Sequence, residues 1–437
     1  METDRTKITG EVEIFEEEIG LIENIGQYGS RIQESSLEKV TKLLEIILGG
    51  AIALNSSDIH IEPGENDAKV RLRMDGILHD VTSIDLKIYK TLLSRIKLLS
   101  KVKLNIMDRP QDGRFTILVA GQTQKPAVIE IRMSTLPAER GEAIVMRLLN
   151  PKNLMEIEVL GLRKDLVKLF LEEIKRPNGM FIVTGPTGSG KTTTLYAILK
   201  RINNPEIKII TIEDPVEYHL AGLSQTQVDP KKGYTFASGL RSIMRQDPDV
   251  MLIGEIRDLE TAEIACQAAL TGHLVFSTLH TNDAAGAVAR LIDLGVRPIS
   301  IAPAANVVIA QRLPRTMCKK CVKFVKPSPE TEKQIKEGLK NVKKEILPAN
   351  FHKSEFKIPA QQGCSNCNST GYKGRIGIYE VMVVDDEIER LILTNPAIID
   401  IKNMAIKKGM VSMYQDGLIK VLEGITTLEE IERVARE

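Results

Sequence analysis

Eight consecutive residues in the middle of the chain have the spacing of a phosphate-binding loop. They match G-x-x-x-x-G-K-[ST] at every fixed position, and they are Gly185, Pro186, Thr187, Gly188, Ser189, Gly190, Lys191 and Thr192. Glycines let backbone N–H groups converge on phosphate, and a following helix adds a favourable dipole. Lys191 would face the β- and γ-phosphates, and the Thr192 hydroxyl would be a ligand of Mg²⁺. The apolar stretch before the loop and the helical stretch after it disfavour a chance match.

A carboxylate follows the next-but-one apolar stretch. Residues 249–253 lead into Gly254 and Glu255, and Gly254 stands where many P-loop enzymes carry an aspartate. Ligands of open α/β sheets bind at the carboxyl ends of the strands, so Glu255 is expected to face the γ-phosphate and to orient or deprotonate the attacking water. The alternative is an acid that only caps the next helix.

A second acidic group, Glu213 with Asp214 and Glu217, closes the preceding apolar stretch. Three carboxylates at one strand end are costly unless a cation or arginines neutralise them, and Mg²⁺ with its waters would do so. Glu213 is therefore a second catalytic candidate. A solvated acidic loop is the alternative, and for Glu217 alone it is equally favoured.

Two histidines flank the apolar stretch 274–278. A histidine at a strand end near phosphate can sense the γ-phosphate or carry a proton, which makes His280 a candidate. A lone histidine is more often a satisfied core residue, and this alternative is stronger for His273. Five arginines lie near these motifs or on predicted strands, but their type and spacing alone do not distinguish them from ordinary surface arginines. They are Arg241, Arg245 and Arg257 around Glu255, and Arg132 and Arg147 on predicted strands nearer the N-terminus.

Four of the five cysteines form two Cys-x-x-Cys pairs, Cys318 with Cys321 and Cys364 with Cys367. Four thiolates suit a tetrahedral structural Zn²⁺ with no open position. Reduced surface thiols and a redox pair are the alternatives. Cys266, in an alanine-rich stretch, is interpreted as a small core residue.

The elements that must position these residues change character along the chain. Helical and alternating strand patterns before residue 150 predict a small α+β domain, whereas buried apolar runs separated by helical segments after residue 160 predict a parallel sheet covered by helices. The expected organisation is an acidic extension, most simply a solvated tail, then the α+β domain, a hinge linker, the α/β core, a four-cysteine module and a helical C-terminal region: 1–36, 37–150, 151–160, 161–315, 316–375 and 376–437.

Composition limits the function classes. The chain has 437 residues with 43% hydrophobic and 27% charged residues and a formal net charge of +1, so its total charge does not favour nucleic acid or acidic membrane. No run of 18 apolar residues and no signal-peptide pattern is present, which predicts a cytoplasmic protein. Cysteine pairs in such a compartment favour metal over disulfides.

Together these motifs resemble the secretion ATPase superfamily, the family of the type II secretion and type IV pilus assembly motors. The further stretches that carry the resemblance are 57–63, 71–76, 111–114 and 416–427, and it covers roughly residues 37–437. About 36 residues precede this region, whereas many pilus-assembly members have a longer N-terminal domain that docks on the membrane apparatus.

The resemblance implies a RecA-like ATPase core preceded by a PAS-like α+β domain, with ATP bound at the cleft between them. It implies a homohexamer in which Arg132 and Arg147 reach the phosphates, while Arg241, Arg245 and Arg257 support the site or a neighbouring subunit. The implied partner is an inner-membrane platform protein of a secretion or pilus system, with the chain cytoplasmic and peripheral to that membrane.

Two other functional classes are disfavoured by the sequence. A nucleic-acid translocase or DNA-uptake-associated RecA-like ATPase is disfavoured by the near-zero net charge, the 4% aromatic content and the lack of Trp for base stacking, so no direct nucleic-acid partner is expected. A nucleotide-gated scaffold with little turnover is disfavoured by the presence of Glu255 and His280.

Overall fold

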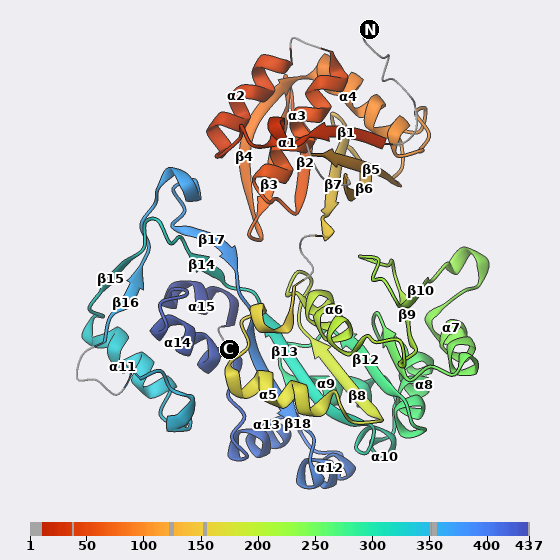
Figure 1. Ribbon diagram of the computed structural model, residues 1–437, viewed down its shortest axis with the longest axis vertical. Helices are drawn as coiled ribbons and strands as arrows, with labels where there is room; N and C mark the ends of the chain where they lie inside the picture. Colours follow the sequence, from red (N-terminus) through yellow and green to blue (C-terminus); the bar gives the residue numbers. More distant parts are fainter. Residues whose placement is uncertain are drawn as a thin grey trace. The chain divides into compact units, whose positions relative to one another are not determined.

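The computed structural model describes residues 11–36, 39–121, 126–151, 155–349, 351 and 356–435 (Figure 1). The chain divides into two compact units, which consist of Met1–Lys152 with Gly363–Gly371, and of Asn153–Gln362 with Tyr372–Glu437. Residues 152–154 of the expected linker lie outside the described residues. In the described part of the chain, no helix is both long enough and apolar enough to cross a membrane.

A seven-stranded sheet forms the first unit, in the order β1-β5-β6-β7-β2-β3-β4. β1 pairs with β5 in parallel, and the other neighbours pair antiparallel. Its strands are β1 (Glu11–Phe15), β2 (Asp58–Pro63), β3 (Asp67–Met74), β4 (Ile77–Asp85), β5 (Gln111–Ala120), β6 (Ala127–Ala138) and β7 (Gly141–Leu149). Its helices are α1 (Glu16–Ile19), α2 (Ile25–Ser35), α3 (Val40–Ala53) and α4 (Leu86–Leu99).

Alternation explains why this sheet has one buried and one polar face. Along β3, Ala68, Val70 and Leu72 are buried, whereas Lys69 between them is exposed. The buried set joins the apolar faces of α2, α3 and α4 in one core. The α+β character expected for this part of the chain is therefore confirmed.

The interpretation of residues 1–36 as a solvated tail is wrong for the described residues 11–36. β1 adds to the edge of the sheet, and Ile14, Tyr28 and Ile32 are fully buried. The Tyr28 hydroxyl donates a hydrogen bond of 2.7 Å to the Ile47 carbonyl. The acidic composition obscured this strand, because Glu11 and Glu13 occupy its outward positions while Val12 and Ile14 point inward.

The second unit contains a sheet in the order β10-β9-β11-β12-β8-β13-β18. The first six strands are parallel, and β18 pairs antiparallel with β13. The strands are β8 (Gly179–Thr184), β9 (Ile209–Glu213), β10 (Ser224–Gln227), β11 (Val250–Ile253), β12 (Leu274–Leu279), β13 (Ala305–Arg312) and β18 (Ile378–Val383). The helices around it include α5 (Lys164–Glu173), α6 (Lys191–Ile202), α7 (Phe236–Ile243), α8 (Leu259–Leu270), α9 (Ala284–Asp293) and α10 (Pro298–Ile301).

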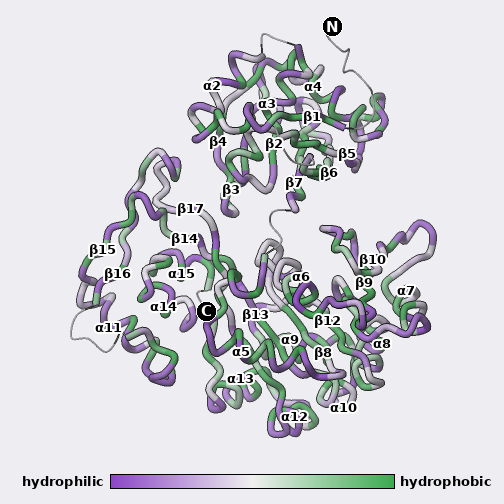
Figure 2. Tube along the Cα trace, viewed as in Figure 1, coloured by the Kyte–Doolittle hydropathy of each residue, from purple (hydrophilic) through white to green (hydrophobic). Residues whose placement is uncertain are grey.

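Both faces of this sheet are covered, as its uninterrupted apolar strands predict. Along β8, Met180 and Ile182 pack in the core that contains α8 and α9, while Phe181 and Val183 pack in the core that contains α5 and α6. Figure 2 shows hydrophobic residues running through the central strands. The predicted α/β core with a parallel sheet is confirmed.

The C-terminal part combines short strands and helices. It consists of β14 (Arg315–Met317), β15 (Lys323–Val325), α11 (Pro329–Gly338), β16 (Ile358–Ala360), β17 (Tyr372–Arg375), then β18, α12 (Asp386–Leu393), α13 (Ile398–Lys407), α14 (Met413–Leu422) and α15 (Leu428–Ala435). β18 thus belongs to the main sheet, although it is distant in sequence from the other strands.

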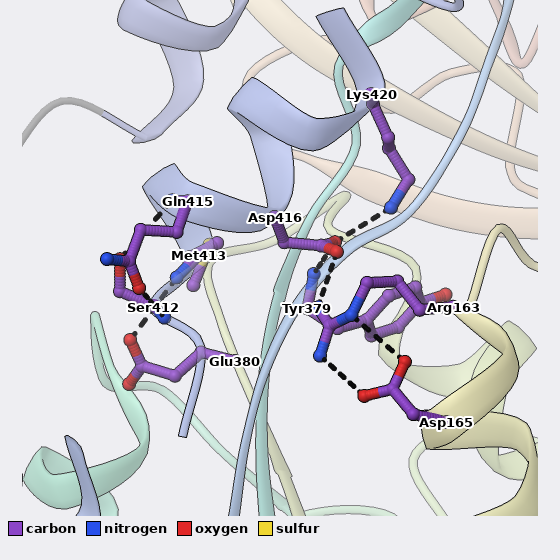
Figure 3. A network of polar contacts seen from close by, with 9 residues as sticks. All are labelled: Arg163, Asp165, Tyr379, Glu380, Ser412, Met413, Gln415, Asp416 and Lys420. Atoms are coloured by element: carbon purple, nitrogen blue, oxygen red, sulfur yellow. Dashed lines mark hydrogen bonds and ion pairs between the residues drawn. The ribbon is translucent and has the colours of Figure 1, made fainter. Parts of the chain in front are cut away.

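A buried ionic network attaches the C-terminal helices to the core (Figure 3). The fully buried Asp416 on α14 accepts hydrogen bonds from Arg163 Nη1 at 2.6 Å, Lys420 Nζ at 2.8 Å and the Tyr379 backbone N–H at 2.9 Å. It joins α14, β18 and the start of α5. The carboxylate offsets the cost of burying two cations.

We expect Asp416→Ala to destabilise the second unit by about 3–5 kcal/mol, because it leaves Lys420 and Arg163 buried beside an empty site. Asp165→Ala is the matched control, since Asp165 bonds the same Arg163 from a position with 44% of its side chain exposed. That exposed contact should contribute about 1 kcal/mol or less. Urea unfolding measures both, and equal losses would contradict the assigned role of Asp416.

Candidate active site

The P-loop joins β8 to α6, and its glycines are required by its shape. Gly185 and Gly190 have φ of 149° and 88°, in the region that disfavours other residues. A Cβ at Gly185 would lie 2.6 Å from Ser189 Oγ and 2.7 Å from the Gln311 carbonyl oxygen. α6 begins at Lys191, so the N-terminal N–H groups of a 12-residue helix face the loop. This arrangement is an anion-binding site.

Lys191 folds back over the loop. Its Nζ donates to the carbonyl oxygens of Gly185 at 2.7 Å and Pro186 at 3.2 Å. Burial lowers the pKa of Lys191 to about 8, with Arg312 contributing in the same direction and Glu255 opposing it. A phosphate group at this position would favour the charged ammonium.

Glu255 follows β11, and its carboxylate lies between a guanidinium and an imidazole. Arg257 Nη2 is 2.6 Å from Oε1, and His280 Nε2 is 3.6 Å from Oε2. Burial, and then the nearby charge of Lys191, lower the pKa of His280 below its usual value, so the imidazole is neutral at pH 7. Only 13% of the Glu255 side chain is exposed. A carboxylate in this position can accept a hydrogen bond from a water near Lys191 and hold it in one orientation.

Glu213, at the end of the neighbouring β9, is enclosed by donors of the protein. Thr211 Oγ1 donates at 2.6 Å, Gln225 Nε2 donates at 3.4 Å, and the Tyr196 hydroxyl also donates to this carboxylate. Burial raises the pKa of Glu213 above its usual value, and these hydrogen bonds oppose the shift. Gly254 packs against its backbone, since a Cβ there would lie 3.2 Å from the Glu213 Cα.

The two histidines lie at opposite ends of β12. His280 follows the carboxyl end, where Thr281 bonds to Thr184 of β8 through hydroxyls 2.7 Å apart and through its N–H at 2.8 Å. His273 precedes the amino end, with Nδ1 3.1 Å from the Ala268 carbonyl oxygen. Only His280 is therefore brought to the same edge of the sheet as the P-loop.

The five candidate arginines have different surroundings. Of the three in the second unit, Arg257 contacts Glu255, whereas Arg241 pairs with Glu260 of α8, and Arg245 Nη1 donates to the Arg241 carbonyl oxygen at 2.8 Å. In the first unit, Arg132 and Arg147 lie directly opposite each other on β6 and β7. Arg147 Nε is 3.0 Å from Asp58 Oδ1, and Arg132 Nε is 3.7 Å from Glu130 Oε1.

Three residues at this site were not singled out from the sequence. Tyr196 donates to Glu213; Gln311 and Arg312 end β13 beside the P-loop. Arg312 Nη2 lies 3.2 Å from the Asn282 carbonyl oxygen, which connects β13 to the loop after His280. The apolar run 305–310 followed by Gln and Arg is the signal that could have indicated a further strand end at this edge.

The four paired cysteines come together. The Sγ atoms of Cys318, Cys321, Cys364 and Cys367 all lie within 4.8 Å of one another. The Cys364 and Cys367 sulfurs are 3.7 Å apart, which matches the edge of about 3.8 Å of a tetrahedron with Zn–S bonds of about 2.3 Å. The N–H of Gly371 donates to Cys367 Sγ at 3.3 Å. The donor set and its spacing fit Zn²⁺.

A P-loop between β8 and α6, with a carboxylate and a histidine at the same edge of a parallel sheet, defines the class of P-loop nucleoside triphosphatases. Residues 33–433 match the family model described as "Type II/IV secretion system protein". The chain belongs to this family, so the resemblance inferred from the sequence is confirmed.

Relatives agree with this assignment. The chain is 45% identical to the type IV pilus assembly ATPase PilB of Thermus thermophilus over 402 residues, covering 92% of this chain and 43% of that protein. It is 43% identical to the type II secretion system ATPase E of Vibrio cholerae over 419 residues, covering 95% of this chain and 79% of the relative. The expected class of enzyme, an ATPase, is the class named for these relatives, and a nucleic-acid translocase is not favoured.

Solved structures share the fold. The pilus retraction motor PilT with bound ADP has a TM-score of 0.59 and 26% identity, covering 89% of this chain and 95% of that chain. The Legionella pneumophila ATPase DotB has a TM-score of 0.64 and 20% identity, covering 90% of this chain and 95% of that chain.

The lowered pKa of Lys191 predicts a pH dependence of nucleotide binding. Phosphate favours the ammonium, so above the free-state pKa of about 8 binding must take up a proton, and affinity for ADP should fall by about tenfold per pH unit. Titration calorimetry between pH 7 and 9.5 in two buffers measures affinity and proton uptake. Lys191→Arg is the control, because guanidinium stays protonated and its profile should be flat. An affinity of the unsubstituted protein that is constant up to pH 9.5 would contradict the assignment.

Proposed function

We propose that the chain hydrolyses ATP and uses the released energy to drive protein export or pilus assembly at the inner membrane. The observation that carries this proposal is the position of Glu255, whose carboxylate is held between Arg257 and His280 at the sheet edge that bears the P-loop. The class named for the relatives supports it.

Each residue has a separate task in this reaction. The loop N–H groups and Lys191 bind the β- and γ-phosphates, and Glu255 orients the attacking water and accepts its proton. Arg257 keeps the Glu255 carboxylate in place, and neutral His280 lies where it can contact the γ-phosphate or that water. Glu213, enclosed by hydrogen bonds, supports the backbone at Gly254. Lys191 supplies one positive charge to the phosphates, and a divalent cation would add to it.

Mg²⁺ is the cation that the site residues fit, because a hydroxyl and carboxylates are the oxygen ligands that hard cations prefer. Thr192, in the first turn of α6, would be a ligand of the ion. The carboxylates that would surround it are those at the ends of β9 and β11, namely Glu213, Asp214 and Glu255. When bound, the ion neutralises negative charge on the phosphates.

The proposed assembly is a homohexamer on the cytoplasmic side of the inner membrane, with a platform protein of the secretion or pilus system as partner. The proposed hinge is the part of the expected linker before residue 157, because Ile157 and Leu160 are buried in the core of the second unit. Arg132 and Arg147 would contact phosphate, and Arg241 and Arg245 would support the site or a neighbouring subunit. Arg132 and Arg147 lie directly opposite each other on β6 and β7, which would present two guanidinium groups to one phosphate.

The test measures mass in solution with a nonhydrolysable ATP analogue, and ATP turnover with and without the cytoplasmic domains of the platform protein. We expect a hexamer whose turnover rises with the partner. Glu255→Gln should assemble and bind ATP but lose turnover by about 10²-fold or more, because the amide cannot accept the proton. A monomer with full, partner-independent activity would refute the motor, and normal turnover by Glu255→Gln would refute the catalytic assignment.

We also propose that Cys318, Cys321, Cys364 and Cys367 bind one structural Zn²⁺ per chain. Metal analysis of anaerobically purified protein should find one zinc, and Cys364→Ser with Cys367→Ser should remove it. Cys266→Ala is the control and should keep it, because Cys266 is buried in α8 apart from the cluster. Structural zinc contributes about 10–16 kcal/mol of apparent binding free energy, so chelation should unfold the segment that carries these cysteines. Protein without zinc would refute this proposal.

A further inference from the structure

Gln311 has a buried side-chain amide, and both of its polar atoms form hydrogen bonds with the P-loop or with α6. It lies near the carboxyl end of β13 and is 1% exposed. Its Nε2 donates to the Ser189 carbonyl oxygen at 2.6 Å, and its Oε1 accepts from Thr194 Oγ1 at 2.8 Å. One side chain thus links the loop to the first turns of α6.

The same residue contacts both ends of the loop. A Cβ added to Gly185 would lie 2.7 Å from the Gln311 carbonyl oxygen, and one added to Gly190 would lie 3.0 Å from Nε2. The absence of side chains at these glycines lets the loop close onto Gln311. β13 pairs with β8, the strand that leads into the loop, so Gln311 is held on the same rigid sheet.

The hydrogen bond to Ser189 has a consequence for the next N–H group. In a trans peptide the C=O and the following N–H point to opposite sides. If Gln311 holds the Ser189 C=O on its own side, the Gly190 N–H must point away from β13, toward the side on which the loop receives an anion. In this way a side chain that does not touch the phosphate can orient a donor that does.

We propose that Gln311 is a positioning residue that holds the P-loop in its phosphate-binding conformation. This inference rests on the proposed nucleotide binding and names a residue that sets its affinity. The competing explanation is that Gln311 only satisfies buried polar groups and contributes to stability alone. Thr194, the hydrogen-bond partner of Gln311, also contacts the side chain of Tyr379. The Tyr379 hydroxyl donates to the Leu160 carbonyl oxygen at 3.1 Å, so the first turns of α6 are also connected to β18 and to the segment before α5.

The chain offers a matched control on the same strand. Asn306, at the other end of β13, is also buried, and its Nδ2 donates to the Asn178 carbonyl oxygen at 2.9 Å. The geometry is the same kind of amide-to-carbonyl hydrogen bond beside β8, at the edge away from the P-loop. Asn306→Asp and Gln311→Glu remove equivalent donors.

The experiment compares Kd for ADP, and KM and kcat for ATP, in Gln311→Glu, Gln311→Leu and Asn306→Asp, with thermal unfolding of each. Leaving a buried carbonyl without its donor is expected to weaken nucleotide binding roughly tenfold or more in both Gln311 variants. KM should rise more than kcat falls. Asn306→Asp should lose a similar amount of thermal stability and bind ADP normally.

A pH profile separates positioning from stability. In Gln311→Glu the introduced carboxyl group can donate to the Ser189 carbonyl oxygen when it is protonated, so affinity for ADP should recover as pH falls from 8 to 5.5. The unsubstituted protein and Gln311→Leu should gain no more than about twofold over this range, the change that protonation of Lys191 brings. Gln311→Leu also removes the donor without adding a charge near the phosphates.

Thr194→Val keeps the test decisive if the Gln311 variants fail to fold, because it removes only the hydroxyl that orients the amide. Its affinity for ADP should fall roughly threefold, the effect of losing part of one neutral hydrogen bond. The proposal is overturned if folded Gln311 variants bind ADP normally, if Asn306→Asp loses as much affinity, or if Thr194→Val is unchanged. Failure of the unsubstituted protein to bind nucleotide would refute the proposed function instead.

Discussion

Parallel pairing of β8 with β12 and β13, and of β11 with β12, is the constraint on which the candidate site depends. Because these strands run in the same direction, their carboxyl ends meet at one edge of the sheet. The P-loop, Glu255, His280 and Gln311 each follow or end one of these strands. Residues that are more than one hundred positions apart in the sequence, such as Gln311 and Ser189, thereby come within hydrogen-bonding distance.

Burial on both faces of the sheet is what keeps that edge rigid. β8, β11 and β12 are buried along their whole length, and the helices on each face belong to separate apolar cores. A residue at the end of such a strand can be aimed only within the freedom of its own side chain. The site then adds short polar links between strand ends, such as Thr184 to Thr281 and Arg312 to Asn282. These links resist separation of the loops when an anion binds.

Charge is distributed differently in the two units. On the polar face of the first unit, Arg114, Arg132 and Arg147 stand opposite one another on neighbouring strands, and Arg147 is opposite Asp58 on β2. Asp58 is buried and also lies 3.7 Å from Arg73. One buried carboxylate between two arginines offsets part of the repulsion in this row. In the second unit, Asp416 does the same for Arg163 and Lys420, but inside the core, where it fixes α14 to β18.

The sequence by itself determined the phosphate-binding loop, the carboxylate at Glu255, the cysteine pairs and the alternation of strands and helices, because each depends on local spacing or on a period of apolar residues. It did not reveal β1, since alternate glutamates hid a two-residue apolar face. It also did not select Gln311, or rank Arg257 above Arg241, because these distinctions depend on which strand ends become neighbours. Only the tertiary structure decided them: strand order and register place a given side chain beside the loop or far from it, and nothing in a residue's immediate neighbours encodes that distance.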